Sequence, residues 1–70
     1  MTPAPLAALV GTPWFGRSLR AARNRAGLSQ WALACRSGIS DRQIRNLEAG
    51  RCRPTRLTLR CLVAVLGDSR

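Results

Sequence analysis

Five polar side chains between residues 40 and 46 are the best candidates in this sequence for specific chemistry: Ser40, Asp41, Arg42, Arg45 and Asn46. Ile44 and Leu47 lie among them, three residues apart, so a helix here would turn its apolar residues to one face and its polar residues to the other. An arginine can donate two hydrogen bonds to guanine O6 and N7, and an asparagine can pair with adenine through its amide. The polar face therefore has the groups needed to read base edges in a DNA groove.

Each of these side chains also has a simpler role that involves no base. Arg42 can contact a phosphate without reading sequence, and Asn46 can be an ordinary solvated residue. Asp41 can stabilise the positive end of a helix, which is more typical of its position than accepting a hydrogen bond from cytosine. Ser40 is first of all a helix cap, and any base contact is secondary. Both sets of roles stay open at the level of sequence.

Two further arginines, Arg51 and Arg53, follow this stretch in a loop. They are predicted to bind phosphates, which supplies affinity without sequence information. Another set of arginines is more typical of a solvated face than of a binding surface: Arg17, Arg20, Arg25, Arg56 and Arg60.

The small and apolar residues from 29 to 50 predict a helix-turn-helix that would position this polar face. Ala34 is small enough for a close crossing of two helices, and Gly38 can adopt the left-handed conformation that the turn requires. Ser29 is predicted to cap the first helix of the pair. Ser40 and Gln43 are predicted to form a capping box at the start of the second.

Start and stop signals predict a single domain over residues 12–67, with the helix-turn-helix proper over 29–49, a loose apolar arm over 1–11 and a tail over 68–70. A helix is expected to begin at Thr12 and Pro13, and another after Thr55. Apolar residues recur at helical spacing in these two helices: Phe15, Leu19, Ala22 and Ala26, then Leu59, Leu62, Val63 and Leu66. The sequence therefore predicts an all-α fold of four short helices around one core.

The composition favours a polyanion as partner. The chain has 70 residues and a net charge of +9, and all 12 basic residues are arginine. A domain this basic is attracted to nucleic acid first and to an anionic membrane second. The internal caps, Gly38 and the single glutamate, Glu48, favour a self-contained fold over a membrane-active peptide. The apolar N-terminal run is too short for a signal peptide or a span, so a cytoplasmic protein with no membrane partner is expected.

No residue pattern predicts an enzyme, a metal or a cofactor. The sequence has no histidine, no suitably spaced pair of carboxylates and no phosphate-binding glycine loop. Its three cysteines, Cys35, Cys52 and Cys61, lack the spacing of zinc ligands. We expect buried or half-buried thiols in a reducing cytoplasm, with a redox switch as the alternative.

From about Leu19 to Gly67 the sequence resembles the Cro/C1-type (XRE-like) helix-turn-helix family of phage and bacterial repressors. The residues that carry the resemblance are Arg23, Gly27-Leu28-Ser29-Gln30, Leu33-Ala34, Gly38-Ile39-Ser40, Ile44, Leu47-Glu48, Gly50-Arg51, Pro54, Thr58-Leu59 and Leu66-Gly67. The resemblance implies a compact, lambda-repressor-like domain of four helices, or an incomplete set of five. It also implies a transcriptional repressor that binds double-stranded DNA with its third helix in the major groove.

The resemblance assigns roles to individual residues. Base edges would be faced by Ser40, Asp41, Arg42 and Asn46, with Arg45 close by. Phosphates would be contacted at the start of the second helix and in the loop after the third, by Ser29, Gln30, Arg51 and Arg53. Arg23 and Glu48 would form a buried ion pair between the first and third helices.

Two features depart from the family. Trp31 stands where polar residues are usual, and we expect it to pack against Leu6, Leu9 or Trp14. The alternative is an exposed anchor for a protein partner, together with the N-terminal arm, in a protein-interaction or antitoxin-like module. The sequence also lacks the fifth helix with which the family often dimerises. A homodimer on a two-fold symmetric operator, with the arm over 4–15 as substitute interface, therefore stands beside binding as a monomer or as part of a larger protein.

Overall fold

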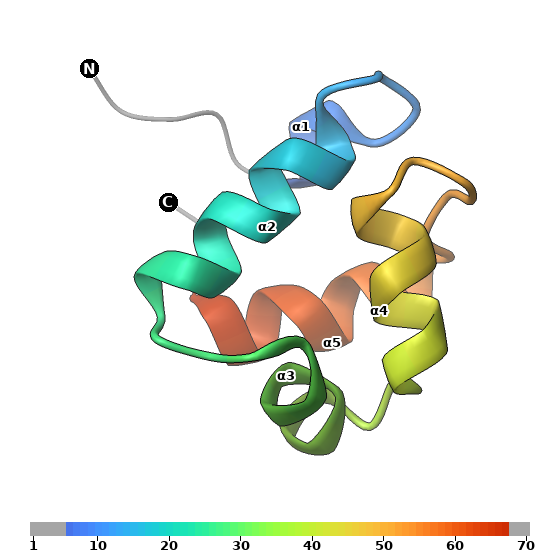
Figure 1. Cartoon of the computed structure of the whole chain (residues 1–70). Coiled ribbons are helices and arrows are strands. Elements are labelled where there is room, and N and C mark those ends of the chain that lie inside the picture. The colour runs from blue at the N-terminus through green and yellow to red at the C-terminus, as the bar shows by residue number, and fades with distance from the viewer. Residues whose placement is uncertain (1–5, 68–70) are drawn as a thin grey trace.

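The computed structural model describes residues 6–67, which form an all-α domain (Figure 1). The helices are α1 (Leu6–Leu9), α2 (Phe15–Arg25), α3 (Gln30–Ser37), α4 (Asp41–Glu48) and α5 (Arg56–Leu66). The predicted fold class is confirmed, because α2 to α5 correspond to the four predicted helices. The single turn of α1 is an addition to them.

Helices α3 and α4 form the helix-turn-helix. Ser29 Oγ accepts a hydrogen bond from the Ala32 amide at 3.0 Å, and Ser40 Oγ accepts one from the Gln43 amide at 3.1 Å. Between the helices, Gly38 has a φ of 76°, which a residue with a side chain rarely adopts. Figure 1 shows α3 end-on beside α4, so the two helices cross steeply. These local signals therefore set the direction in which α4 leaves the turn.

One apolar core joins all five helices. Six side chains in it are at most 1 % exposed: Leu6, Leu19, Leu33, Ile44, Leu47 and Leu62. Complete burial of such a side chain contributes about 1.5–3 kcal/mol relative to leaving it exposed. Two of the six, Ile44 and Leu47, belong to α4, so its inner face is fixed and its polar face must point outward.

The N-terminal region differs from the predicted loose arm. Residues 6–9 are helical and Leu6 is buried in the core, so the Leu6 side chain is not available to a dimer interface. Helix α2 begins at Phe15 rather than at the predicted Thr12 and Pro13. Thr12 Oγ1 instead donates to the Leu9 carbonyl at 2.7 Å and accepts from the Trp14 amide at 3.3 Å. Residues 1–5 and the predicted tail over 68–70 lie outside the described residues.

Three other expectations need correction. In the described part of the chain, the Ser40 backbone amide makes no hydrogen bond to Gln43, so the capping box is incomplete. The side-chain Nε2 of Gln43 donates to Thr58 Oγ1 at 3.5 Å instead. Ala26 is exposed at the end of α2, beyond the last buried turn. Val63 is only half-buried and lines a shallow apolar hollow on the outside of α5 with Leu59.

Gly16 is a structural residue that the sequence analysis did not single out. A Cβ at this position of α2 would lie 2.6 Å from the Glu48 carbonyl oxygen and 2.8 Å from that of Leu47. Both are backbone atoms, so no side-chain rotation can relieve the contact. Gly16 therefore allows the start of α2 to approach the end of α4 closely.

Gly16→Ala is expected to destabilise the fold by about 1–3 kcal/mol, because overpacking must push α2 and α4 apart. At an open helical site the same change would stabilise by about 1 kcal/mol, so the sign is diagnostic. Urea unfolding followed by circular dichroism measures the effect. Asn24→Ala on the exposed surface of α2 is the control and should change stability by less than about 0.5 kcal/mol. A Gly16→Ala variant as stable as the parent would show that the helices do not need this close contact.

Candidate nucleic-acid interface

The exposed side of α4 carries a shallow hollow lined by Arg42, Arg45, Asn46, Ala49 and Arg51, which we call the α4 hollow. The structure thus brings together four of the predicted DNA-contacting residues. Arg51 begins the loop after α4, and its amide donates to the Asn46 carbonyl at 2.9 Å. This bond fixes the start of the loop against the helix. The result is one surface with three arginines and an amide, suited to a polyanion that also presents hydrogen-bond acceptors.

Asp41 pairs with Arg45 one helical turn later. Their Oδ2 and Nη2 atoms are 3.1 Å apart, and the Arg45 side chain is 59 % exposed. An exposed pair of this kind adds little stability, but it offsets the negative charge of Asp41 at the start of α4. Among residues 6–67, Arg42 has no such carboxylate partner. Arg42 is therefore the arginine of α4 that is available to an outside acceptor.

Glu48, at the end of α4, is buried, with a side chain only 1 % exposed. Arg23 of α2 donates from Nε to Oε2 at 2.6 Å and from Nη2 to Oε1 at 3.2 Å. Its remaining nitrogen, Nη1, donates to the Leu28 carbonyl at 2.8 Å. Two parallel bonds between a guanidinium and a carboxylate fix direction as well as distance. Arg23 therefore attaches α2 both to α4 and to the segment that leads into α3.

Helix α3 reaches the same carboxylate. Gln30 Nε2 donates to Glu48 Oε1 at 3.1 Å, so a residue predicted to contact phosphate also has a partner inside the protein. Arg20 Nε lies 3.5 Å from the same oxygen, but its side chain is 64 % exposed and the contact contributes little. One buried carboxylate thus joins α2, α3 and α4. We call Glu48, Arg23 and Gln30 the Glu48 cluster.

The cluster keeps Glu48 ionised. Burial alone would raise the pKa of Glu48, but the hydrogen bonds from Arg23 and Gln30 and the charge of Arg23 outweigh it and lower the pKa overall. The hydrogen bond to Glu48 likewise raises the pKa of Arg23, against the effect of its burial. Because the folded pKa of Glu48 lies below its ordinary value of 4.5, its contribution to stability is present above that pH. It is lost as the pH falls through the folded pKa.

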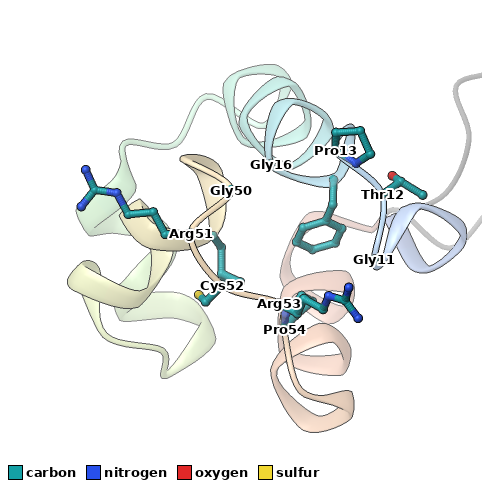
Figure 2. A pocket seen from close by; sticks show the side chains of 11 residues that line it. Gly11, Thr12, Pro13, Gly16, Gly50, Arg51, Cys52, Arg53 and Pro54 are labelled. Atoms are coloured by element: carbon teal, nitrogen blue, oxygen red, sulfur yellow. The ribbon is translucent and has the colours of Figure 1, made fainter.

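The loop after α4 sends its two arginines in opposite directions (Figure 2). Arg51 lines the α4 hollow, whereas Arg53 does not. Both residues also border a pocket of about 300 Å³ between this loop and the start of α2, with Pro13 and Pro54 among its other walls. Arg53 is exposed, so the two arginines present their charges at different points of the surface.

Trp31 does not pack as expected. Its side chain is 68 % exposed on α3, so the predicted contact with Leu6, Leu9 or Trp14 is wrong. Leu6 lies in the core instead, and α1 packs against α2 and α5.

The thiols and the possible metal ligands form no site in the described residues. Cys35 and Cys52 are exposed and Cys61 is half-buried, so the expected burial holds for Cys61 alone. Within residues 6–67, no group of histidine, cysteine or acidic residues could hold a metal ion. None of the described helices has the length and apolar character needed to span a bilayer.

Comparison with known families agrees with this geometry. A family model described as a helix-turn-helix domain matches residues 14–70, which include α2 to α5. The chain belongs to the helix-turn-helix domain family. No curated protein matches the sequence. In this helix-turn-helix protein the matched region contains the α4 hollow and the Glu48 cluster.

The stability of this helix-turn-helix protein is expected to depend on Arg23 much more than on Arg20, although both approach Glu48. Arg23→Met leaves a buried carboxylate without its main partner and should cost about 3–5 kcal/mol. Arg20→Met removes an exposed contact and should cost less than about 1 kcal/mol. Urea unfolding at neutral pH compares the two variants. Equal losses would show that the buried pair does not hold α2 to α4.

Proposed function

We propose that this helix-turn-helix protein binds double-stranded DNA sequence-specifically, with α4 in the major groove. The observation that carries the proposal is the α4 hollow, where Arg42, Arg45 and Asn46 of the second helix of the motif meet Arg51 of the following loop. Helix-turn-helix proteins insert this helix and contact base edges with its N-terminal residues. The buried face of α4 supports the same orientation, because Ile44 and Leu47 leave only the polar side free.

Within this proposal the base-reading residues are Ser40, Asp41, Arg42, Arg45 and Asn46. Arg42 is the leading reader, because it is exposed and has no carboxylate partner in the described part of the chain. Asp41 and Arg45 are bound to each other, so each must exchange that partner for a base or act as a pair. Each good bidentate contact contributes about 1–3 kcal/mol of discrimination against the wrong base.

The proposed phosphate contacts are Ser29, Gln30, Arg51 and Arg53. The amide nitrogen of Gln30 carries two protons and uses one for Glu48, which leaves the second for a phosphate oxygen. The Ser29 hydroxyl oxygen accepts from the Ala32 amide, so its own proton can be donated outward. Such contacts fix the position of α3 on the backbone and carry no sequence information.

The resemblance to Cro/C1-type repressors supports a finer proposal. The protein would act in the cytoplasm of a bacterium as a transcriptional repressor that occupies its operator, without enzymatic activity.

We also propose that two copies bind an operator with two-fold symmetry, as is usual for helix-turn-helix proteins. The number of chains per duplex, measured by analytical ultracentrifugation on DNA of one and two half-sites, tests the homodimer. One chain on each length of duplex would contradict it.

A second candidate function is a protein-interaction or antitoxin-like module. The exposure of Trp31 favours it, because tryptophans are common anchors at interfaces. The Glu48 cluster is consistent with this function too, because it would stabilise the fold of a protein that binds no DNA. Two results together would favour this function. The chain would bind a protein partner at high salt and lose that binding in Trp31→Ala, and it would show no selectivity among DNA duplexes.

Arg42→Ala is expected to remove base preference at one position of the binding site, whereas Arg51→Ala should weaken all duplexes alike. The reason is that Arg42 is placed to read a base and Arg51 to neutralise a phosphate, so only Arg51→Ala should lower the salt slope, by about one. Selection of bound duplexes from a random pool gives the preference, and titrations at several salt concentrations give the slope.

The matched control for these variants is Arg60→Ala. Arg60 is an exposed arginine that lines the separate hollow outside α5. The Arg60→Ala substitution removes the same charge as Arg42→Ala and should leave both the base preference and the salt slope nearly unchanged. If Arg42→Ala left the selected motif intact, or if Arg60→Ala reproduced its effect, the proposed reading surface would be wrong.

A further inference from the structure

We propose that Gln43 is a positioning residue for DNA recognition, which holds the first turn of α4 in place by its contact with Thr58 of α5. The inference rests on the proposed DNA-binding function. It concerns a residue whose side-chain amide nitrogen bonds to α5, so the proposed role requires no contact between Gln43 and a base.

The contact belongs to a short chain of polar groups. Gln43 Nε2 donates to Thr58 Oγ1 at 3.5 Å, and Thr55 Oγ1 donates to the same oxygen at 2.9 Å. Thr55 is the N-cap of α5, and its Oγ1 also accepts from the Thr58 amide at 3.1 Å. Thr58 is therefore held by the cap of its own helix, and Gln43 attaches α4 to this fixed point.

The two ends of α4 are held in different ways. Its last residue belongs to the Glu48 cluster, and Gly16 lets α2 press closely against the same end. Packing along α4 is more extensive against α2 and α3 than against α5. Among residues 6–67, the contact of Gln43 with Thr58 is thus the side-chain hydrogen bond between α5 and the end of α4 that carries Asp41 and Arg42.

The length of α4 makes this link important for recognition. A helix of eight residues is about 12 Å long, so even a small shift of its first turn, within the limits set by the buried Ile44, moves the reading face relative to the end held by the Glu48 cluster. Binding groups must be held to within about 0.5 Å of their productive geometry. A loss of the contact therefore lowers affinity for the correct sequence more than affinity for DNA in general.

A double-mutant cycle tests the role of Gln43. Gln43→Met and Thr58→Val keep the size of each side chain and remove its hydrogen-bonding group. The probe is a duplex selected from a random pool by the unaltered chain, and the comparison is a shuffled duplex of the same composition. Each single variant should lower affinity for the selected duplex by about three- to tenfold, and the double variant by no more than either single one. Affinity for the shuffled duplex should stay within about twofold.

Thr58→Ser is the matched control, because it keeps the hydroxyl and should retain parental affinity. Circular dichroism and hydrogen exchange at the α4 amides accompany each titration. We expect folded variants with faster exchange near Gln43 in both single variants.

Several results would overturn the inference. An effect of Gln43→Met without an effect of Thr58→Val would show that Gln43 acts on DNA directly. Effects that multiply in the double variant would show that the two residues act independently, and parental affinity throughout would show that the contact has no role. If the unaltered chain bound both duplexes equally, the proposed DNA-binding function would itself fail, and the positioning role with it.

Discussion

The arrangement of the helices in this helix-turn-helix protein depends on the hydrogen bonds and the ion pair made by the buried carboxylate of Glu48. Arg23 brings α2 to it and Gln30 brings α3, while Glu48 itself ends α4. A charge in this place must be paired, because an unpaired buried charge is costly. The requirement specifies how three helices meet, and so the direction in which α4 presents its polar face.

The charges inside the protein stabilise the fold, whereas the charges on its surface favour a polyanion as partner. Inside, one carboxylate is matched by hydrogen bonds from Arg23 and Gln30. Outside, the α4 hollow gathers three arginines near a single acidic side chain, Asp41. Like charges held close together repel one another, and a bound polyanion relieves that repulsion. The fold and the proposed attraction to DNA therefore draw on largely different residues, with Gln30 placed in both groups.

The sequence was sufficient for features that depend on neighbouring residues. The Ser40 cap and the left-handed Gly38 follow from interactions within a few positions, so the turn and the start of α4 were predictable. Most long-range packing was not, and the Arg23–Glu48 pair was expected only because of the family resemblance. The burial of Leu6 and the close approach at Gly16 depend on residues from distant parts of the chain. Gln43 shows the difference. Its spacing from Ser40 predicts a capping box, but its side-chain Nε2 donates to Thr58 of α5.

Nuclear magnetic resonance can locate the DNA-binding surface directly. A duplex selected from a random pool would be titrated into the isotopically labelled chain, and the backbone amides followed residue by residue. If α4 lies in the major groove, the largest shifts gather on residues 40–46 and on Arg51, with smaller ones at Gln30 and almost none at Val63 outside α5. Shifts centred on α1 or on the outer face of α5, with residues 40–46 unaffected, would contradict that placement of α4.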